Sequence, residues 1–536
     1  ILNITPGEYK LKVTYIGYQT QEINVEVEAQ RPLHIDIKLK PGVIQGNEII
    51  ALGERLDGQA KALNQQRANN NITNVVSTDQ IGRFPDQNIG DAMKRIPAIS
   101  VSYDQGEARF VNIRGTEPRL NSVMIDGDRV PSAEAEARNV QVDLIPSDMV
   151  QTIEVNKSIT PDMEGDAIGG AINLVTRSAP TGLRISGTLG SGINLLSQKP
   201  IWNGSLIVGN RLFDDKLGII LSGSLYDHHL GSDNTEGKWT EDNGTIYPEE
   251  WQVREYRIRR ERTSVSGALD YQFSPNNNIY FKAIYNHRND WENRYRLVYK
   301  VDKQQLERQT KGGIGNDAND NARLEDQRTY KFSLSGDHIL FNNLSFNWSA
   351  SYLQASEERP NERYLQFNIK KIPQTYDLSN LKQPKILYES TSPNDLANWK
   401  FDVLSEQYQY TEESDINAKL DFELPISEGE YSNNLKFGGK FRTKDKKRDN
   451  NFFEYTPING FETLADVPTS NYSDPDFLAG DYLVGDFASS KFLGSLDLNN
   501  PELFEKADKP SEYAANNFSA TENVIAGYAM WTQNIG

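Results

Sequence analysis

The chain has 536 residues and a net charge of −18, with 57 Lys and Arg against 75 Asp and Glu. This acidic balance argues against a nucleic-acid partner, because phosphate binding needs clustered cations. The absence of cysteine excludes disulfides and thiolate metal sites. Mean hydropathy is −0.64, and no long apolar run predicts a membrane helix. Membrane strands remain compatible with this value, because their lipid-facing and lumen-facing residues alternate.

Residues 1–40 alternate between apolar and polar positions. Tyr9, Leu11 and Val13 share one face of a first strand, and two further runs, 23–27 and 33–39, repeat the pattern. Three strands with short turns predict the end of a small β-sandwich.

Residues 41–74 form a predicted linker, which Pro41-Gly42 opens. Within it lies an apolar segment in a polar context: Glu48, Ile49, Ile50, Ala51, Leu52 and Gly53. Such a segment suits strand addition at the sheet edge of another protein. The alternative is a linker strand that packs on the domain that follows. A short helix is predicted at Asp57–Arg67.

Residues 75–178 predict a small α+β domain. Asp86 is a candidate N-cap for a helix whose apolar stripe comprises Ile89, Ala92, Met93 and Ile96, and which Pro97 ends. Asp126-Gly127 predicts a hairpin turn, because both residues tolerate positive φ. Strands are predicted at Ile99–Tyr103, Arg109–Arg114, Asn121–Ile125, Gln151–Asn156 and Ala171–Thr176. We find no catalytic grouping in this domain.

Residues 182–536 alternate over long stretches. Val265, Leu269 and Phe273 face one way, whereas Ser264 and Asp270 face the other. Short connections (214–215, 274–278, 337–343 and 427–434) alternate with long ones (230–250, 290–323, 357–410 and 449–523). This asymmetry is typical of an outer-membrane barrel, with short periplasmic turns and long outer loops. We expect the first part of such a barrel, with about ten strands.

Three sequence blocks identify a family resemblance. They are QIGRFPDQNIGDAMKRIPAISV, the pair VNIRG and LNSVMIDGDR, and SDMVQTIEVNKSITPDMEGDAIGGAINLVTR. In order and spacing they resemble the plug domain of TonB-dependent outer-membrane receptors. The resemblance implies a mainly β fold: a transmembrane antiparallel β-barrel that holds an α+β plug, preceded by a β-sandwich remnant. Family barrels have twenty-two strands, so we expect this chain, which starts at Ile1 without a leader, to be a fragment.

The resemblance also implies partners and a location. The segment Glu48–Gly53 resembles the TonB box, which pairs with TonB of the inner-membrane energising complex. The stretch Pro6–Gln19 resembles a carboxypeptidase-regulatory-like domain. The expected location is the outer membrane of a Gram-negative cell, in contact with its lipid, with the N-terminal segment in the periplasm. A surface lipoprotein is a possible further partner.

Several residues are candidates for function. The resemblance marks Arg114, Gly115, Asp126, Gly127, Asp128, Arg129, Gly169 and Gly170 as plug signatures, with ion pairs between plug and barrel wall as the expected role of the charged ones. Ligand contact is expected at a plug apex containing Glu117 and Arg119, and aromatic residues of the outer loops could stack on sugar rings: Trp239, Trp251 and Trp291. The alternative for these tryptophans is the interfacial girdle.

Cargo and chemistry are the last expectations. The PDMEGDAIGG block resembles a branch linked to oligosaccharide uptake, which makes an oligosaccharide the leading cargo. A ferric siderophore or other chelate is the alternative, as is a passive or adhesive barrel. No nucleophile–base grouping predicts an enzyme, and no cofactor or metal site is expected. His228-His229 is expected to be a solvated loop pair, and Ala322 and Arg328 break the only calcium-loop pattern.

Overall fold

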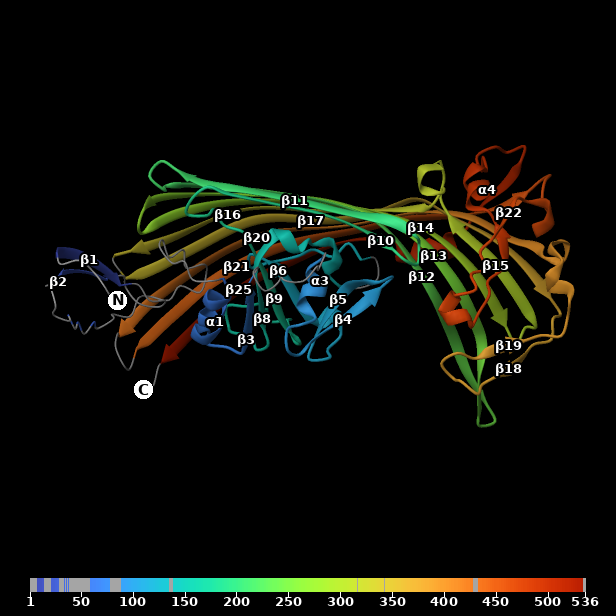
Figure 1. Ribbon diagram of the computed structural model, residues 1–536, viewed down its shortest axis with the longest axis horizontal. Coiled ribbons are helices and arrows are strands. Elements are labelled where there is room, and N and C mark those ends of the chain that lie inside the picture. The colour runs from blue at the N-terminus through green and yellow to red at the C-terminus, as the bar shows by residue number, and fades with distance from the viewer. Residues whose placement is uncertain are drawn as a thin grey trace.

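The computed structural model describes residues 7–13, 21–27, 33, 35, 37, 58–77, 88–134, 138–315, 317–341, 343–427 and 432–533. A long curved sheet dominates the molecule, and a small domain lies against its concave side (Figure 1). We call the sheet the wall and the small domain the plug. The segment Glu48–Gly53, the candidate N-cap Asp86 and His34 lie outside the described residues.

The N-terminal part contains one hairpin and one helix within the described residues. Strands β1 (Gly7–Val13) and β2 (Gln21–Val27) pair antiparallel, with Leu11 opposite Ile23. Helix α1 (Gly58–Ala68) confirms the predicted short helix, and it contacts the plug through strand β3 (Thr73–Ser77).

The plug contains a five-stranded sheet in the order β3-β8-β9-β6-β7. Its remaining members are β8 (Val150–Asn156), β9 (Gly170–Thr176), β6 (Asn121–Ile125) and β7 (Asp128–Arg129). Only the β6–β9 pair is parallel. A separate hairpin, β4 (Ile99–Asp104) and β5 (Glu107–Ile113), packs beside helix α3 (Ile89–Met93). All five strands predicted in this domain are therefore present.

Local sequence explains the helix and the turn. Ile89, Met93 and Ile96 are buried, which confirms the predicted apolar stripe. The helix begins after Asn88, whose side chain accepts a 3.0 Å hydrogen bond from the amide of Asp91, so the predicted cap at Asp86 is wrong. An asparagine amide oxygen caps a helix as well as a carboxylate does. Asp126 and Gly127 both have positive φ, as the predicted turn requires.

The wall is a twelve-stranded sheet, and its described strands all pair antiparallel. Ten of the strands have 11 residues or more, enough to cross a bilayer. They are β10 (Arg184–Asn194), β11 (Lys199–Leu212), β12 (Leu217–Asp242), β13 (Thr245–Ser274), β14 (Asn277–Lys300), β16 (Arg323–Leu340), β17 (Leu344–Lys370), β20 (Lys400–Ser427), β21 (Asn433–Pro457) and β25 (Phe518–Gln533). Two shorter strands, β15 (Gln305–Gly312) and β24 (Phe504–Asp508), extend it.

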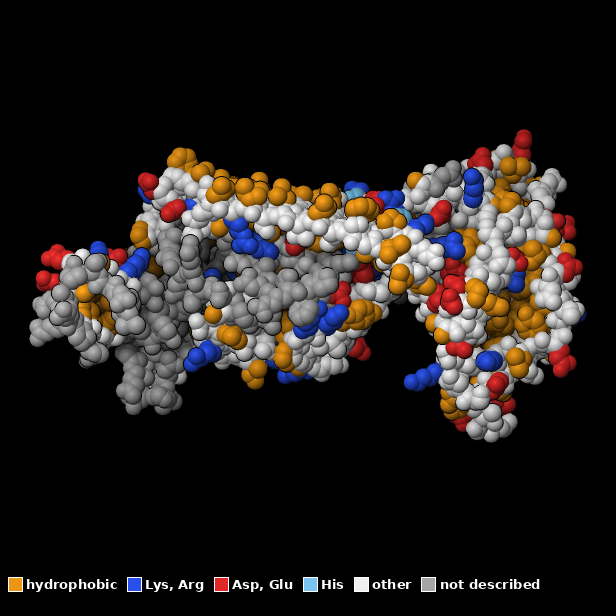
Figure 2. All heavy atoms as spheres, viewed as in Figure 1, with side chains coloured by type: hydrophobic (Ala, Val, Ile, Leu, Met, Phe, Trp, Pro, Cys, Tyr) orange, Lys and Arg blue, Asp and Glu red, His pale blue; other side chains and the backbone are white. Residues whose placement is uncertain are grey.

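The predicted alternation along the wall is confirmed. On β13, Val265 and Phe273 are 51% and 60% exposed, whereas Ser264 and Asp270 on the opposite face are 2% and 8% exposed. Lys331 of β16 is also buried on the face toward the plug. Figure 2 shows hydrophobic side chains in a row along the convex side of the wall. Mainly β structure with an apolar exterior and a polar interior agrees with the expected barrel.

Four segments were expected to be long loops, and here the prediction is partly wrong. Strands β12 and β13 stay paired through 230–250 as far as Asp242 and Thr245, so this connection is a hairpin whose turn is Asn243-Gly244. Strands also enter 290–323, 357–410 and 449–523. Backbone hydrogen bonds thus continue well beyond the apolar belt. The short elements inside the last two segments are β18 (Thr375–Asp377), β19 (Lys385–Leu387), β22 (Thr469–Asn471), β23 (Asp486–Ala488), α4 (Ser490–Ser495) and α5 (Pro510–Tyr513).

The extended strand ends carry an apolar core of their own, which we call the outer cluster. It lies on the outward face, because Trp251 and Tyr295 alternate in register with Val265 and Tyr285. A register shift after Arg359 of β17 turns Leu365 and Phe367 to this same face. The loops 371–399 and 458–517 supply the cover, with Trp399, Phe477 and Phe487 fully buried.

No helix among the described residues is long and apolar enough to cross a membrane.

Candidate functional site: the contact between plug and wall

The plug touches the wall through charged groups. Glu107, the first residue of β5, is 4% exposed. Arg260 Nη1 donates to its Oε2 at 2.7 Å, and Arg262 Nη1 donates to its Oε1 at 2.9 Å. Both arginines belong to β13 and are themselves buried. Burial raises the pKa of Glu107, but the two guanidinium groups outweigh it and hold that pKa well below the usual range.

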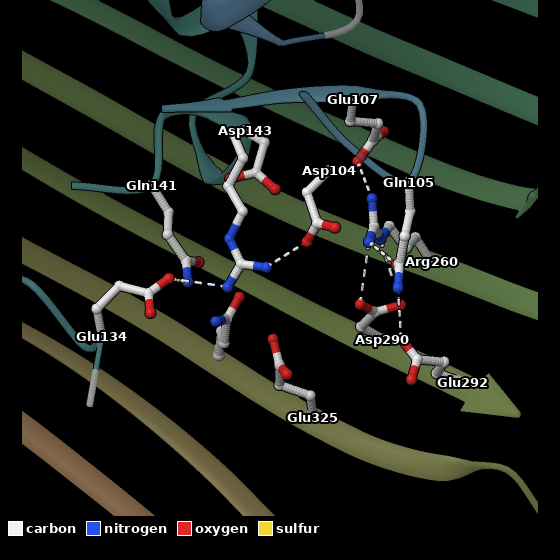
Figure 3. A network of polar contacts seen from close by, with 12 residues as sticks. Asp104, Gln105, Glu107, Glu134, Gln141, Asp143, Arg260, Asp290, Glu292 and Glu325 are labelled. Atoms are coloured by element: carbon white, nitrogen blue, oxygen red, sulfur yellow. Dashed lines mark hydrogen bonds and ion pairs between the residues drawn. The ribbon is translucent and has the colours of Figure 1, made fainter. Parts of the chain in front are cut away.

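The turn before Glu107 extends this network. Gln105 Nε2 donates to Glu292 at 2.6 Å, and Arg260 Nη2 donates to Gln105 Oε1 at 2.7 Å. Arg260 is also 3.2 Å from Asp290. Figure 3 shows these side chains converging from the β4–β5 turn and from the wall strands beneath it. The tip of this hairpin is thus fixed to β13 and β14.

A second group of charges lies alongside. Arg288 of the wall is 1% exposed and joins Asp143 of the plug to Glu325, which is 3.1 Å away. Glu325 also accepts from Arg323 at 2.6 Å and from Arg359 at 2.8 Å. These contacts link the plug to three neighbouring wall strands, β14, β16 and β17.

Further contacts fix the body of the plug. Lys282 lies 3.1 Å from Asp126, and Lys331 lies 2.9 Å from Asp128. The amide of Thr176 donates to Asp126 at 2.9 Å, so the predicted hairpin turn is held from both sides. Burial raises the pKa of Asp126, but the two lysines lower it more, and the net shift is downward.

Two carboxylates of the 157–169 loop contact β21. Asp162 lies 2.5 Å from Lys436, and Glu164 pairs with Lys440 and lies 3.2 Å from Arg442. For both carboxyls burial raises the pKa, but the neighbouring lysine reverses the shift and leaves the pKa lowered. We call these pairs the β21 contacts.

The other signature residues act within the plug. Arg114 has φ of 54° and donates to the carbonyl of Gly169 at 3.0 Å. Gly115 follows at φ of 75°. Gly169 and Gly170 approach their neighbours closely, since a Cβ on Gly169 would stand 2.0 Å from Asn121 Oδ1. Arg129 pairs with Asp166. The structure thus brings the charged signature residues Asp126 and Asp128 to the wall, whereas Arg114 is exposed and bonds within the plug.

The candidate ligand residues lie elsewhere. Glu117 and Arg119 pair with each other at 2.5 Å and are more than 60% exposed. The plug residues that reach toward the outer part of the wall are those of the Asp104–Glu107 turn, which the sequence analysis did not select. The sequence did contain a signal for this turn. Gln105-Gly106 separates two strand-like runs, and an acidic residue, Glu107, follows directly.

The three tryptophans lie on the outward face of the wall. Trp251 is 4% exposed within the outer cluster, and its ring meets that of Trp239 edge-on at 6.3 Å. Trp291 pairs across strands with Arg259, whose guanidinium lies 5.7 Å from the indole ring. These rings therefore point away from the lumen side, where the plug lies.

Three arginines occupy the inward face beyond the plug: Arg254 of β13 and Arg294 and Arg296 of β14. Arg254 and Arg296 are direct cross-strand neighbours. Their hydrogen-bond partners include neutral amides: Arg254 Nε donates to Gln252 at 2.7 Å and Arg294 Nη2 donates to Gln309 at 2.8 Å. The Nε atoms of Arg294 and Arg296 are buried without a partner. We call these residues the arginine trio; they could bind an anionic group.

Among the described residues, no cluster of His, Asp and Glu could hold a metal ion. His228 is 2% exposed on the inward face, beside Tyr226, so the expectation of a solvated loop position is wrong for this residue. The strand continues past it and buries it.

Comparison with known proteins gives one family match. Residues 65–171 match the family model described as the TonB-dependent Receptor Plug Domain. Solved structures that resemble the chain include the unliganded ferric citrate transporter FecA, at 13% identity over 74% of this chain and 62% of that chain, with a TM-score of 0.36. A mutant of the ferric enterobactin receptor PfeA from Pseudomonas aeruginosa matches at 10% identity, over 74% of this chain and 79% of that chain, with a TM-score of 0.36. The siderophore receptor PirA from Pseudomonas aeruginosa matches at 14% identity, over 72% and 81%, with a TM-score of 0.31. The chain thus spans less than two thirds of the FecA structure.

Proposed function

We propose that this chain is a TonB-dependent receptor that takes up a large ligand across the outer membrane with energy delivered by TonB, and the match of residues 65–171 to the plug-domain model supports this proposal. One observation carries the proposal beyond the family match. Among the described residues, the apolar core of the plug is almost entirely its own, and Ile284 is the one wall residue in the cluster. Its polar contacts with the wall are ion pairs and hydrogen bonds, such as Glu107 with Arg262 and Gln105 with Glu292.

An apolar core inside the plug, combined with polar contacts between plug and wall, suits a domain that must move without unfolding. Separating an apolar interface exposes apolar surface to water, and the cost grows with area. Separating ion pairs returns the charges to water, which recovers much of their lost hydration. A pulling force can therefore loosen the plug from the wall while the plug core resists. In the proposed cycle, ligand binding releases Glu48–Gly53 into the periplasm, TonB pairs with this segment, and force remodels the plug.

The TonB step is testable at one residue. Ile50→Pro removes a backbone donor from the segment that would add a strand to TonB. We expect uptake to be lost while ligand binding by the purified full-length receptor is unchanged. Gln45→Pro, outside the six residues, is the control and should retain uptake. Uptake that survives Ile50→Pro would favour the passive or adhesive barrel.

For the cargo we propose an oligosaccharide, supported by the resemblance of the Pro161–Gly170 block. The arginine trio adds a chemical requirement. Arg254 is already paired with Glu236 at 2.6 Å, but the half-buried guanidinium groups of Arg294 and Arg296 suit carboxylate or sulfate groups on the ligand. A ferric chelate is the second candidate, and the same two arginines favour it, since many chelates are anionic.

Calorimetry on the full-length receptor separates these candidates. The ligands are neutral oligosaccharides, acidic oligosaccharides and ferric chelates. We expect the acidic sugars to bind, and Arg296→Gln to weaken them about tenfold, the loss of one charge-assisted contact. Arg328→Gln, an exposed arginine of β16 that pairs with Asp326 and lies outside the trio, is the control. Binding of a ferric chelate without binding of any sugar would show that the cargo is a chelate and not an oligosaccharide.

A further inference from the structure

A cavity of about 370 Å³ opens on the outward face of the wall, away from the plug. Strands β12, β13 and β14 form its floor, through outward residues such as Asp233, Glu255 and Trp291. The β10–β11 turn, the 318–322 loop and the 471–475 loop form its sides. Its volume lies within the range of small-ligand sites. None of this cavity lies on the route that the plug closes.

Its position relative to the membrane follows from β12. Leu221 and Leu225 are outward and about 60% exposed, as lipid-facing residues are. Asp227 and His229 are the next outward positions, and His229 already lines the cavity. At roughly 3.3 Å per residue, the cavity begins within about 15 Å of the last apolar side chain. That distance places it among the lipid headgroups or just beyond them.

The three Lys and Arg side chains that line the cavity each have a carboxylate partner. Arg257 lies 2.9 Å from Glu255, Arg259 lies 2.8 Å from Asp227, and Lys199 lies 3.6 Å from Asp320. Two more carboxylates, Asp233 and Asp474, line it. The cations of the cavity are therefore not free to bind a phosphate, and an anionic ligand is disfavoured.

The unmatched groups are acceptors. Glu255 Oε2 and Asn293 Oδ1 are buried without a hydrogen-bond donor, and both residues line the cavity. Buried acceptors of this kind are costly unless a ligand or water supplies the donor. Trp291 adds an apolar ring to the same lining. Hydroxyl donors combined with an apolar C–H face are the chemistry of a sugar ring.

We propose that this outward cavity binds uncharged saccharide units, independently of the transported cargo. The ligand is either the sugar part of a glycolipid in the outer leaflet or a free oligosaccharide. Because the cavity lies outside the lumen, its occupant is held at the cell surface and is not carried inward.

The test uses the detergent-purified full-length receptor and two arms. In one, maltohexaose, cellohexaose and chitohexaose are titrated calorimetrically; in the other, lipopolysaccharide carried through purification is measured by native mass spectrometry. Trp291→Ala removes the ring, and Glu255→Gln replaces the orphaned acceptor while keeping its shape. Trp348→Ala and Glu454→Gln, outside the cavity, are the matched controls.

We expect one of the two arms to show binding that each cavity variant weakens about tenfold and neither control changes by more than twofold. Binding only in the second arm identifies the glycolipid as the source, and binding in the first identifies free sugar. The proposal is overturned if neither arm shows binding, or if binding survives both cavity variants. Uptake by Glu255→Gln should equal that of the wild type, so failure here leaves the proposed transport standing, and failure of transport leaves this binding measurable.

Discussion

Glu107→Gln tests whether buried ion pairs hold the plug in the wall. Arg262 has two hydrogen bonds to Glu107, whereas Arg260 also has Asp290 and Gln105. The substitution therefore leaves the Arg262 guanidinium, at 4% exposure, without a carboxylate. Breaking one partner of a buried pair costs about 3–5 kcal/mol. Gln keeps one acceptor oxygen, so we expect about 3 kcal/mol, a shift of roughly a hundredfold in the docked plug population.

The assay follows release of the plug in urea. The 536 residues contain no cysteine, so Ser158→Cys, with any cysteine elsewhere in the receptor replaced by serine, provides a site for an environment-sensitive fluorophore on the plug. The free energy of plug release is extrapolated to water for each variant of the full-length receptor. Glu117→Gln is the matched control, because its partner Arg119 is exposed and such pairs contribute about 0–1 kcal/mol.

Two results would refute the reasoning. One is a change below about 1 kcal/mol, indistinguishable from the Glu117→Gln control. The other concerns the double variant Glu107→Gln with Arg262→Met. Removing the stranded charge should recover at least about half of the lost stability, because a buried pair replaced by apolar groups is often neutral. No recovery would show that the loss has another origin.

The remaining predictions concern pH and close packing. The pKa values of Asp162 and Glu164 are lowered in the folded receptor. The β21 contacts should therefore stabilise the plug fully above about pH 5 and lose that contribution as the pH falls below about 4. Urea midpoints of plug release between pH 8 and pH 3.5 measure this effect, and a midpoint that does not change with pH would contradict it. Gly169→Ala places a methyl group 2.0 Å from Asn121 Oδ1 and 2.1 Å from Thr116 Oγ1, and should destabilise the plug by about 2–3 kcal/mol. Gly165→Ala has no atom within 4 Å of the added methyl and should leave the same urea midpoint unchanged; equal effects of the two would refute the steric argument.

Local patterns predicted most of the plug. The stripe of Ile89, Met93 and Ile96 and the Asp126-Gly127 turn are set by residues near one another in the chain, so periodicity and turn chemistry suffice. The helix cap was placed two residues early because Asp86 and Asn88 both offer a capping oxygen. Only the fold selects between them.

Partners distant in sequence escaped prediction. Glu107 and Arg262 are 155 residues apart, and nothing near either residue indicates the other. The alternation predicted for Ser264 and Asp270 continues in the structure to Arg260 and Arg262, which share their face. The ends of the strands were misjudged for a related reason. The polar composition of 230–250 predicted a loop, but pairing between neighbouring strands, such as that of Asp233 with Glu255, keeps the chain extended.

The outward face of the wall consists of three zones along the same strands: an apolar belt that includes Leu225 and Val265, a polar band that includes Asp227 and Arg259, and the outer cluster around Trp251. The polar band marks the boundary between the hydrocarbon core of the membrane and water. If the receptor sank by even two residue pairs, charged side chains would enter hydrocarbon; if it rose by as much, the belt would meet water. Because the polar band lies on paired strands, it fixes the depth at which the wall is inserted in the bilayer. Tilting of the wall or thinning of the bilayer would move charged side chains into hydrocarbon and is therefore unfavourable.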